Sequence, residues 1–190
     1  SRVPEGQRSH HVAALPFAHR FTAESACYAR TPTQVRKRLM CGFVGFMAYA
    51  GKERPSAEWL ARMNDTIRHR GPDDDGVVVD GSVGFAFRRL AILDLTTAGH
   101  QPMRSPDKNL LMVFNGEIYN YVELRDELAA LGHRFSSSGD AAVLLAAYQQ
   151  WGNACVDHLA GMFAFAIYNA LSGTVFLARD RFGEKPLFLH

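Results

Sequence analysis

The sequence predicts an α+β fold in which mostly antiparallel sheets and helices pack in layers. Short apolar segments typical of strands cluster near both ends of the region 40–190, and two amphipathic helical segments lie between them. Neighbouring strand segments are joined by short turns. This favours antiparallel pairing, because a parallel crossover needs roughly a dozen residues or more.

The first predicted elements are a strand and a helix. Residues 43–48 form an apolar strand that ends before Gly51. A helix begins at Pro55-Ser56, and Gly71-Pro72 ends it. Its apolar residues recur at helical spacing and are Leu60, Met63 and Ile67.

The middle of the chain predicts a hairpin followed by two further strands. Residues 76–79 and 83–87 are strands that flank Asp80-Gly81, a dipeptide typical of two-residue hairpin turns. Residues 90–93 and 110–114 are apolar runs of strand length.

Two helices and a second hairpin complete the pattern. Residues 121–131 form a helix that Gly132 terminates, and Asp140 is predicted as the N-cap of the next helix. Residues 162–168 and 174–178 form an antiparallel pair across a short turn. The apolar helix residues are Leu124, Leu128 and Leu131 in the first, and Val143, Leu144, Ala147, Tyr148 and Trp151 in the second.

Composition is that of an ordinary globular protein, with 47% hydrophobic and 21% charged residues. No apolar run approaches the ~20 residues that a membrane-spanning helix needs, so we expect no membrane association. Cys27, Cys41 and Cys155 show no paired spacing. We therefore expect free thiols and a reducing, cytoplasmic location.

Residues 1–39 differ from the rest in charge. They hold seven basic and two acidic residues, whereas the remainder holds 14 and 17, so the basic character is not expected to give the main domain affinity for nucleic acid. Without sustained periodicity, this leader is expected to be poorly ordered. Three explanations stay open: a start assigned upstream of the true one, a removable pro-segment or targeting peptide, and a retained extension.

Met40-Cys41-Gly42 is the most informative feature. Removing everything up to Met40 would give Cys41 a free α-amine beside its thiol, and the two groups titrate at roughly 8 and 8.5. That pair is a nucleophile with its own base. With the leader attached, the nitrogen is an amide without basicity. The alternative interpretation of a lone cysteine is a small buried hydrophobe.

Three other segments carry polar groups that suit a site. The polar turn 68–76 supplies too few ligands for a cation and is assigned a site-shaping role. Arg88 and Arg89 point to opposite faces of a strand, so at most one serves a pocket. Asn115-Gly116 follows the strand 110–114 and offers a side-chain amide beside a backbone N–H, which are the parts of an oxyanion hole.

Eight blocks follow in order from Met40 to the C-terminus. They are Met40-Cys41-Gly42, RHRGPDDDG (68–76), RRLAILDL (88–95), GHQPM (99–103), FNGEIYNY (114–121), SGD (138–140), GMFAFAIY (161–168) and RDRFGEKPL (179–187). This series resembles the class II, N-terminal nucleophile (Ntn) glutamine amidotransferases, and within them the glutaminase domain of glutamine-hydrolysing asparagine synthetase. The resemblance implies a four-layer αββα sandwich of the Ntn-hydrolase type.

The resemblance also implies a mechanism and site residues. The Cys41 thiol would attack the side-chain amide of L-glutamine with its α-amine as base, and Asn115 and Gly116 would hold the oxyanion. The substrate-binding residues would be Arg89 for the α-carboxylate, Asp140 with Glu117 for the α-ammonium, and Ile92 and Leu93 as pocket lining. This half-reaction is expected to need no metal or cofactor.

The family continues into a synthetase domain that binds ATP and aspartate through a phosphate loop, and no such loop occurs here. Residues 40–190 are therefore predicted to be a C-terminally truncated glutaminase domain. Ammonia would pass to a missing or separate synthetase, where ATP and magnesium are expected, and a homodimer is a further expectation. The alternatives are an inactive remnant or binding module with Cys41 blocked by the leader, and an amidotransferase with another ammonia acceptor.

Overall fold

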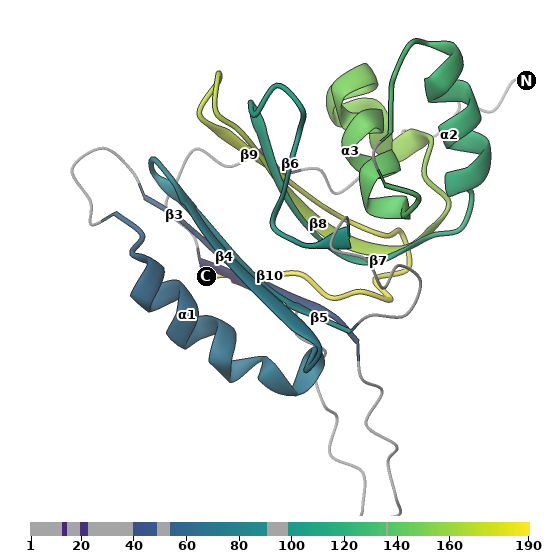
Figure 1. Ribbon diagram of the computed structural model, residues 1–190. Coiled ribbons are helices and arrows are strands. Elements are labelled where there is room, and N and C mark those ends of the chain that lie inside the picture. Colours follow the sequence, from purple (N-terminus) through teal and green to yellow (C-terminus); the bar gives the residue numbers. More distant parts are fainter. Residues whose placement is uncertain (1–12, 15–19, 23–39, 49–53, 91–98, 136) are drawn as a thin grey trace, which may run out of the picture.

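A computed structural model describes residues 13–14, 20–22, 40–48, 54–90, 99–135 and 137–190. The described part is a four-layer sandwich in which two sheets stack face to face and helices cover both outer faces (Figure 1). Helix α1 (Ala57–Thr66) packs on one sheet, and α2 (Tyr121–Ala130) and α3 (Asp140–Trp151) lie over the other. The predicted αββα layering is confirmed.

The sheet beneath α1 has the order β10-β2-β3-β5-β4, and every pair in it is antiparallel. Strand β4 begins two residues before the predicted start, because Asp74 and Asp75 already pair with Arg89 and Arg88. Gly81 turns the β4–β5 hairpin at a φ of 59°, a conformation that favours glycine. The strands are β2 (Arg20–Thr22), β3 (Gly42–Met47), β4 (Asp74–Asp80), β5 (Val83–Arg89) and β10 (Phe188–Leu189).

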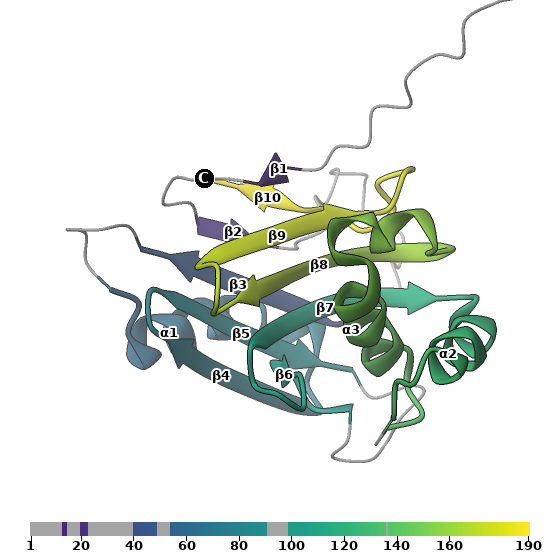
Figure 2. The ribbon, with the colours of Figure 1, turned by 90° about the horizontal axis from the view of Figure 1, so that it is seen from above.

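The second sheet has the order β1-β9-β8-β7-β6 and is likewise antiparallel (Figure 2). Its central pair, β7 with β8, runs in unbroken register from Leu110 opposite Asn169 to Ile118 opposite Gly161. The strands are β1 (Ala13–Ala14), β6 (Met103–Arg104), β7 (Leu110–Ile118), β8 (Gly161–Asn169) and β9 (Thr174–Arg179). The predicted β8–β9 hairpin is confirmed.

The helices begin and end close to their predicted bounds, with two corrections. Ser56 caps α1 by accepting the Trp59 N–H at 3.1 Å, which agrees with the predicted start at Pro55-Ser56. The α-helix ends at Thr66, and a 3₁₀ turn fills the space up to the predicted stop at Gly71-Pro72. Gly139 is the N-cap of α3 and Asp140 is its first helical residue, and the Asp140 carboxylate accepts the Ile118 N–H of strand β7 at 3.0 Å. Leu131 is 52% exposed and lies beyond α2, so it does not share the buried face of the other leucines. Two short 3₁₀ helices are η1 (Arg68–Arg70) and η3 (Gly152–Asp157).

Two predictions concern segments that the structure describes only in part. Leu90 lies outside any strand, and the rest of the predicted strand 90–93 falls outside the described residues. Within the leader, residues 13–14 and 20–22 form the short strands β1 and β2, and the poor order expected of the leader as a whole stays a prediction. Strand β2 pairs with β3 and β10, so backbone hydrogen bonding orders this part of the leader. The boundary at residue 40 stays a prediction.

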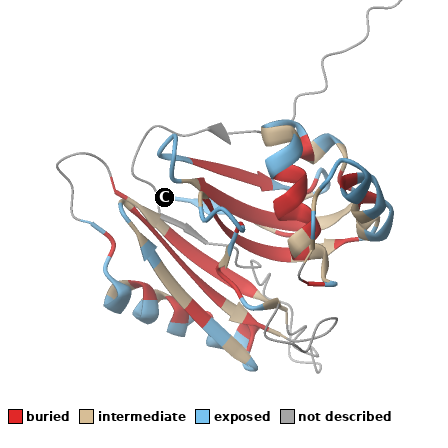
Figure 3. Ribbon diagram, turned by 45° about the horizontal axis from the view of Figure 1, so that its top comes forward, coloured by how far each residue is buried: buried red, intermediate tan, exposed pale blue. Residues whose placement is uncertain are grey.

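An apolar layer between the two sheets joins the halves of the molecule (Figure 3). Along β5, Phe85 and Phe87 face the second sheet, while Ala86 faces α1, as the two-residue period of a strand requires. Separate apolar clusters lie under α1 and under α2 and α3. No helix in the described ranges is long and apolar enough to cross a membrane.

We expect the side chains buried between the two sheets to contribute most to the stability of the fold. Phe85 is fully buried there, so Phe85→Ala should lower the free energy of unfolding by about 3–5 kcal/mol in urea denaturation. Phe182→Ala is the matched control, because Phe182 is 91% exposed and its loss should change the free energy by less than about 0.5 kcal/mol. Equal midpoints for the two variants would contradict the assignment of the core.

Candidate active site

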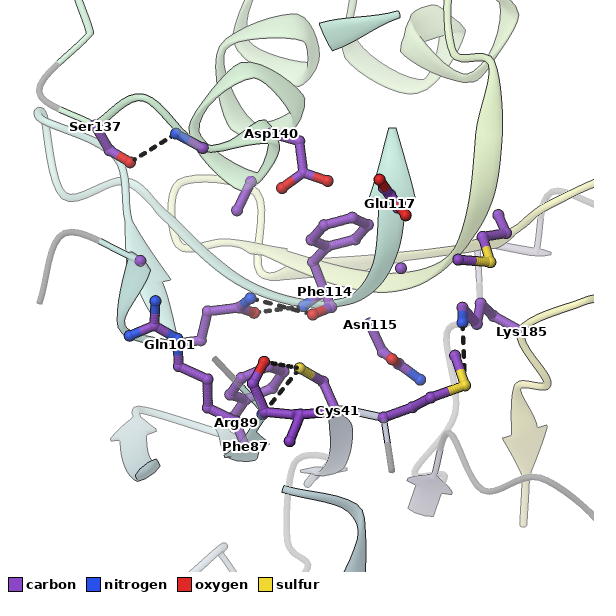
Figure 4. Close-up of a pocket in the computed structure, with 17 residues that line it drawn as sticks. Cys41, Phe87, Arg89, Gln101, Phe114, Asn115, Glu117, Ser137, Asp140 and Lys185 are labelled. Atoms are coloured by element: carbon purple, nitrogen blue, oxygen red, sulfur yellow. Dashed lines mark hydrogen bonds between the residues drawn. The ribbon is translucent and has the colours of Figure 1, made fainter. Parts of the chain in front are cut away.

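A cavity of ≈ 180 Å³ opens where the start of β3, the end of β5 and the end of β7 come together (Figure 4). It lies between the two sheets, next to the first turn of α3. Most of its polar lining comes from residues far apart in sequence. They are Cys41, Arg89, Gln101, Asn115, Glu117, Ser137, Asp140 and Lys185.

Cys41 directly precedes β3, whose pairing with β5 places Gly42 opposite Arg88. The Cys41 Sγ accepts the Leu90 N–H at 3.3 Å and lies 3.5 Å from the Leu90 carbonyl oxygen. Burial raises the pKa of the Cys41 thiol, against the opposing effects of the Leu90 N–H and of the cations Arg89 and Lys185. The thiol is therefore fixed in direction at the cavity wall.

On one edge of β7, the backbone groups of Phe114 and Ile118 are hydrogen-bonded to side chains. The Gln101 side chain accepts the Phe114 N–H at 2.6 Å and donates to the Phe114 carbonyl at 3.1 Å. The Asp140 carboxylate accepts the Ile118 N–H at 3.0 Å. Alternate N–H groups of a strand point to the same edge, so the Gly116 N–H points the same way as these two. It lies between the two capped positions and faces the cavity.

Asn115 supplies a second donor at the same place. Its side chain is 2% exposed, and among the described residues its Nδ2 has no hydrogen-bond partner. Leaving a buried donor unpaired costs roughly 1–3 kcal/mol, so such a group is typical of a site that meets an acceptor only in a complex. Figure 4 shows the Asn115 amide between Cys41 and Lys185.

Both expected donors line the cavity, but the predicted end of the strand at residue 114 was wrong. Asn115 and Gly116 lie inside β7, which continues to Ile118. Glycine is required because a Cβ at Gly116 would lie 2.2 Å from the Met162 carbonyl oxygen across the β7–β8 pair. The Asn-Gly sequence here reflects close strand packing rather than a reversal of the chain.

Arg88 and Arg89 point to opposite faces of β5, as predicted. Arg88 pairs with Asp65 at 2.5 Å and Asp75 at 3.4 Å on the side of α1. Arg89 is buried, lines the cavity and lies 4.0 Å from the Asp74 carboxylate. Arg89 is therefore the arginine of this pair whose side chain lines the cavity.

The segment 68–76 shapes the site without entering it. A Cβ at Gly71 would lie 2.5 Å from the Arg89 backbone, and a Cβ at Gly76 would lie 2.1 Å from the Gln101 carbonyl oxygen. Both glycines allow the segment to press against residues that line the cavity. Among the described residues no group of three or more His, Cys, Asp or Glu side chains is arranged to hold a metal ion.

Asp140 and Glu117 lie across the cavity from Cys41 and Arg89 (Figure 4). Burial raises the pKa of the Asp140 carboxyl, while the Ile118 N–H opposes this effect. Arg125 holds the approach to α3 by donating to the carbonyl oxygens of Ser137 at 2.8 Å and Gly139 at 3.2 Å. This end of the cavity is acidic, and the Arg89 end is basic.

The cavity thus gathers six of the predicted site residues, namely Cys41, Arg89, Asn115, Gly116, Glu117 and Asp140. The predicted lining residues Ile92 and Leu93 lie outside the described residues. Gln101 and Lys185 also line the cavity and were assigned no role from the sequence. Each lies within one of the eight recognised blocks, which was the available signal.

Comparison with known proteins agrees with this geometry. A family model described as a glutamine amidotransferase domain matches residues 40–190, which include every residue that lines the cavity. The chain belongs to the glutamine amidotransferase family.

The amidotransferase domain is similar to part of several larger proteins. It is 46% identical over 151 residues to glutamine-hydrolysing asparagine synthetase 1 of Bacillus subtilis. The alignment covers 78% of this chain and 24% of the Bacillus protein. A putative asparagine synthetase of Mycobacterium tuberculosis (strain H37Rv) is 46% identical to this chain over 166 residues. That alignment covers 79% of this chain and 25% of the Mycobacterium protein. Among solved structures, a glutamine phosphoribosylpyrophosphate amidotransferase from B. subtilis aligns over 48% of this chain and 22% of its own, with 24% identity and a TM-score of 0.41. The chain spans about a quarter of the length of these curated relatives.

The role of Gln101 in the amidotransferase domain can be tested by stability. Gln101→Met removes both hydrogen bonds to Phe114 and leaves its buried N–H and carbonyl unpaired, so the free energy of unfolding should fall by about 2–3 kcal/mol. Gln149→Met on the exposed face of α3 is the matched control and should change it little. Chemical denaturation measures both, and an unchanged Gln101→Met midpoint would show that β7 does not depend on this side chain.

Proposed function

We propose that this amidotransferase domain hydrolyses L-glutamine to glutamate and ammonia through a thioester on Cys41. The observation that carries the proposal is the convergence of three groups on one cavity. The Cys41 Sγ, the Gly116 N–H and the Asn115 Nδ2, which has no partner in the part of the chain that the structure describes, all face the same space. A nucleophile beside two fixed donors is the arrangement that acyl transfer from an amide requires.

The reaction begins with attack of Sγ on the side-chain amide carbon of glutamine. The Cys41 α-amine takes the thiol proton, and the carbonyl π electrons move onto oxygen, where Asn115 Nδ2 and the Gly116 N–H stabilise the charge. As the carbon–nitrogen bond breaks, the α-ammonium returns the proton to the departing nitrogen, which leaves as ammonia. Water then attacks the thioester with the same amine as base, and glutamate leaves as the carbon–sulfur bond breaks and the thiol is reprotonated.

The two ends of the cavity suit the two charges of an amino acid. Arg89 would bind the α-carboxylate of glutamine, and Asp140 with Glu117 would bind its α-ammonium. The buried side chain of Arg89 and the hydrogen bond from Ile118 to Asp140 support these roles, because both groups are held in place before substrate arrives. Ile92 and Leu93 would complete the lining.

The proposed mechanism requires Cys41 to be the first residue. With Met40 attached, its nitrogen is an amide and cannot accept a proton. One observation favours the alternative of an inactive remnant that keeps its leader: β2 pairs directly with β3, so part of the leader belongs to the sheet that positions Cys41. Cleavage of the Met40–Cys41 bond is the event that separates the two possibilities.

We further propose that the ammonia serves ATP-dependent asparagine synthesis in a synthetase domain or subunit in the cytoplasm. The support is the similarity to one quarter of glutamine-hydrolysing asparagine synthetases, whose remaining length has no counterpart in this chain. ATP and magnesium would act there, whereas glutamine hydrolysis would need no cofactor. Another ammonia acceptor is the alternative, and pull-down of the partner protein distinguishes the two.

Cleavage provides a direct test of the nucleophile. In a full chain with a protease recognition sequence in place of residues 37–40, glutamate release from glutamine should be absent before cleavage and appear after it. Cys41→Ala should abolish the activity of the cleaved protein. Cys155→Ala should retain it, because Cys155 is buried outside the cavity. Equal turnover before and after cleavage, or full activity of Cys41→Ala, would overturn the proposal.

If Asn115 stabilises the oxyanion, its replacement should lower activity strongly and stability little. Asn115→Ala should lower kcat by ~10²–10³ with little change in KM, because the lost donor acts on the transition state. The thermal midpoint should change little, since Nδ2 donates no hydrogen bond within the described fold. Asn153→Ala, at an exposed position of η3, is the control for kinetics. A raised KM with unchanged kcat would instead make Asn115 a substrate-binding group.

A further inference from the structure

A hydrogen-bonded turn after β9 holds Lys185 in place. The buried Asp180 carboxylate accepts backbone N–H groups from Phe163 at 3.2 Å, Phe182 at 3.1 Å, Glu184 at 2.9 Å and Lys185 at 2.9 Å. These hydrogen bonds link the turn to β8, and they stabilise the negative charge of Asp180 within the turn. The backbone of Lys185 is therefore fixed relative to the strand that pairs with β7.

The Lys185 side chain is directed from this turn into the cavity. It is 2% exposed, and its Nζ lies 3.5 Å from the Met40 Sδ, on the residue bonded to the Cys41 nitrogen (Figure 4). Lysine is almost never so buried without an anionic partner. Among the described residues Lys185 makes no ion pair, and a thioether is a weak acceptor. Such a placement costs stability and is typical of a functional position.

We propose that Lys185 is a positioning residue for glutamine hydrolysis, whose fixed ammonium beside the Cys41 α-amine and thiol keeps the amine unprotonated and the thiol nucleophilic. This inference rests on the proposed function. Lys185 contacts the side chain of Met40, so cleavage of the Met40–Cys41 bond creates the new amine at this side of the cavity.

The direction of the effect follows from the charges around the pair. A nearby cation disfavours a protonated amine and favours a thiolate, so it lowers the pKa of both groups. The groups that act on Lys185 are Arg70, Cys41, Glu184 and Asp180, and Arg89 acts with Lys185 on the thiol. Burial, together with Arg70, lowers the pKa of Lys185 itself. The charges that act on the Cys41 thiol are the cations Arg89 and Lys185, which lower its pKa against the larger, opposite effect of burial.

The test compares pH profiles of kcat/KM for the cleaved full chain. A free α-amine has a pKa of about 8, and below that pH only its neutral fraction is active. Lys185→Met should move the acidic limb to higher pH by about one unit, so that activity at low pH falls about tenfold and activity at high pH approaches wild type. Lys185→Arg should restore the wild-type limb. Lys108→Met in the exposed turn before β7 is the matched control and should not move it.

A second measurement does not depend on turnover. The rate at which iodoacetamide alkylates Cys41, followed by peptide mass spectrometry against pH, should show a higher thiol pKa in Lys185→Met than in wild type. Cys155 is a silent internal reference, because burial raises its pKa to about 12.

Each other outcome overturns the inference. A loss of kcat/KM that is uniform in pH would make Lys185 structural, and a change confined to KM would make it a substrate anchor. Unmoved kinetic and alkylation profiles would show that its charge does not reach Cys41. If cleaved wild-type protein released no glutamate, the proposed function would fail. The alkylation profile would then still show whether the charge of Lys185 acts on the thiol.

Discussion

Face-to-face packing of the two sheets is the constraint on which the rest of the structure depends. Phe43, Phe85 and Phe87 of one sheet meet Leu111 and Val113 of the other in a buried hydrophobic layer. This layer fixes how the end of β7 stands relative to the start of β3. Cys41 and Asn115 come from different sheets, so their approach is set by the packing and not by any local turn. A nucleophile and an oxyanion donor in two sheets stay aligned only while that layer is intact.

The cavity concentrates polar groups that the fold stabilises poorly. Within the described ranges the Asn115 Nδ2 has no hydrogen-bond partner, Lys185 is buried beside a thioether, and burial raises the pKa of both Cys41 and Asp140. Each of these features costs free energy in the isolated domain. Their gathering in one small space is expected where binding and catalysis require groups that water and neighbouring residues do not satisfy. The apolar layer below supplies the stability that offsets this cost.

Local patterns in the sequence predicted most elements, because strands and helices reveal their own periods. The β4–β5 and β8–β9 hairpins and the helix capped by Ser56 follow from residues close in sequence. Cys41, Arg89 and Asn115 were found because their motifs have distinctive chemistry. Gln101 and Lys185 were missed because their partners are distant, with Lys185 and Met40 separated by 145 residues. The strand 110–114 was predicted to end too early, since only the opposing strand shows why β7 continues past Gly116 and why Gly116 must lack a side chain.

The pairing of strand β2 with β3 is compatible with a free α-amine on Cys41. Strand β2 pairs Arg20, Phe21 and Thr22 with Phe46, Gly45 and Val44 of β3, and none of these bonds involves the Met40–Cys41 peptide. Cutting that peptide would leave both neighbours of β2 in place, so the sheet could keep the strand as a separate chain. The leader would then cover an edge of β3 that otherwise exposes unpaired backbone groups. The same residues that block the nucleophile while covalently attached would support its position once the bond is broken.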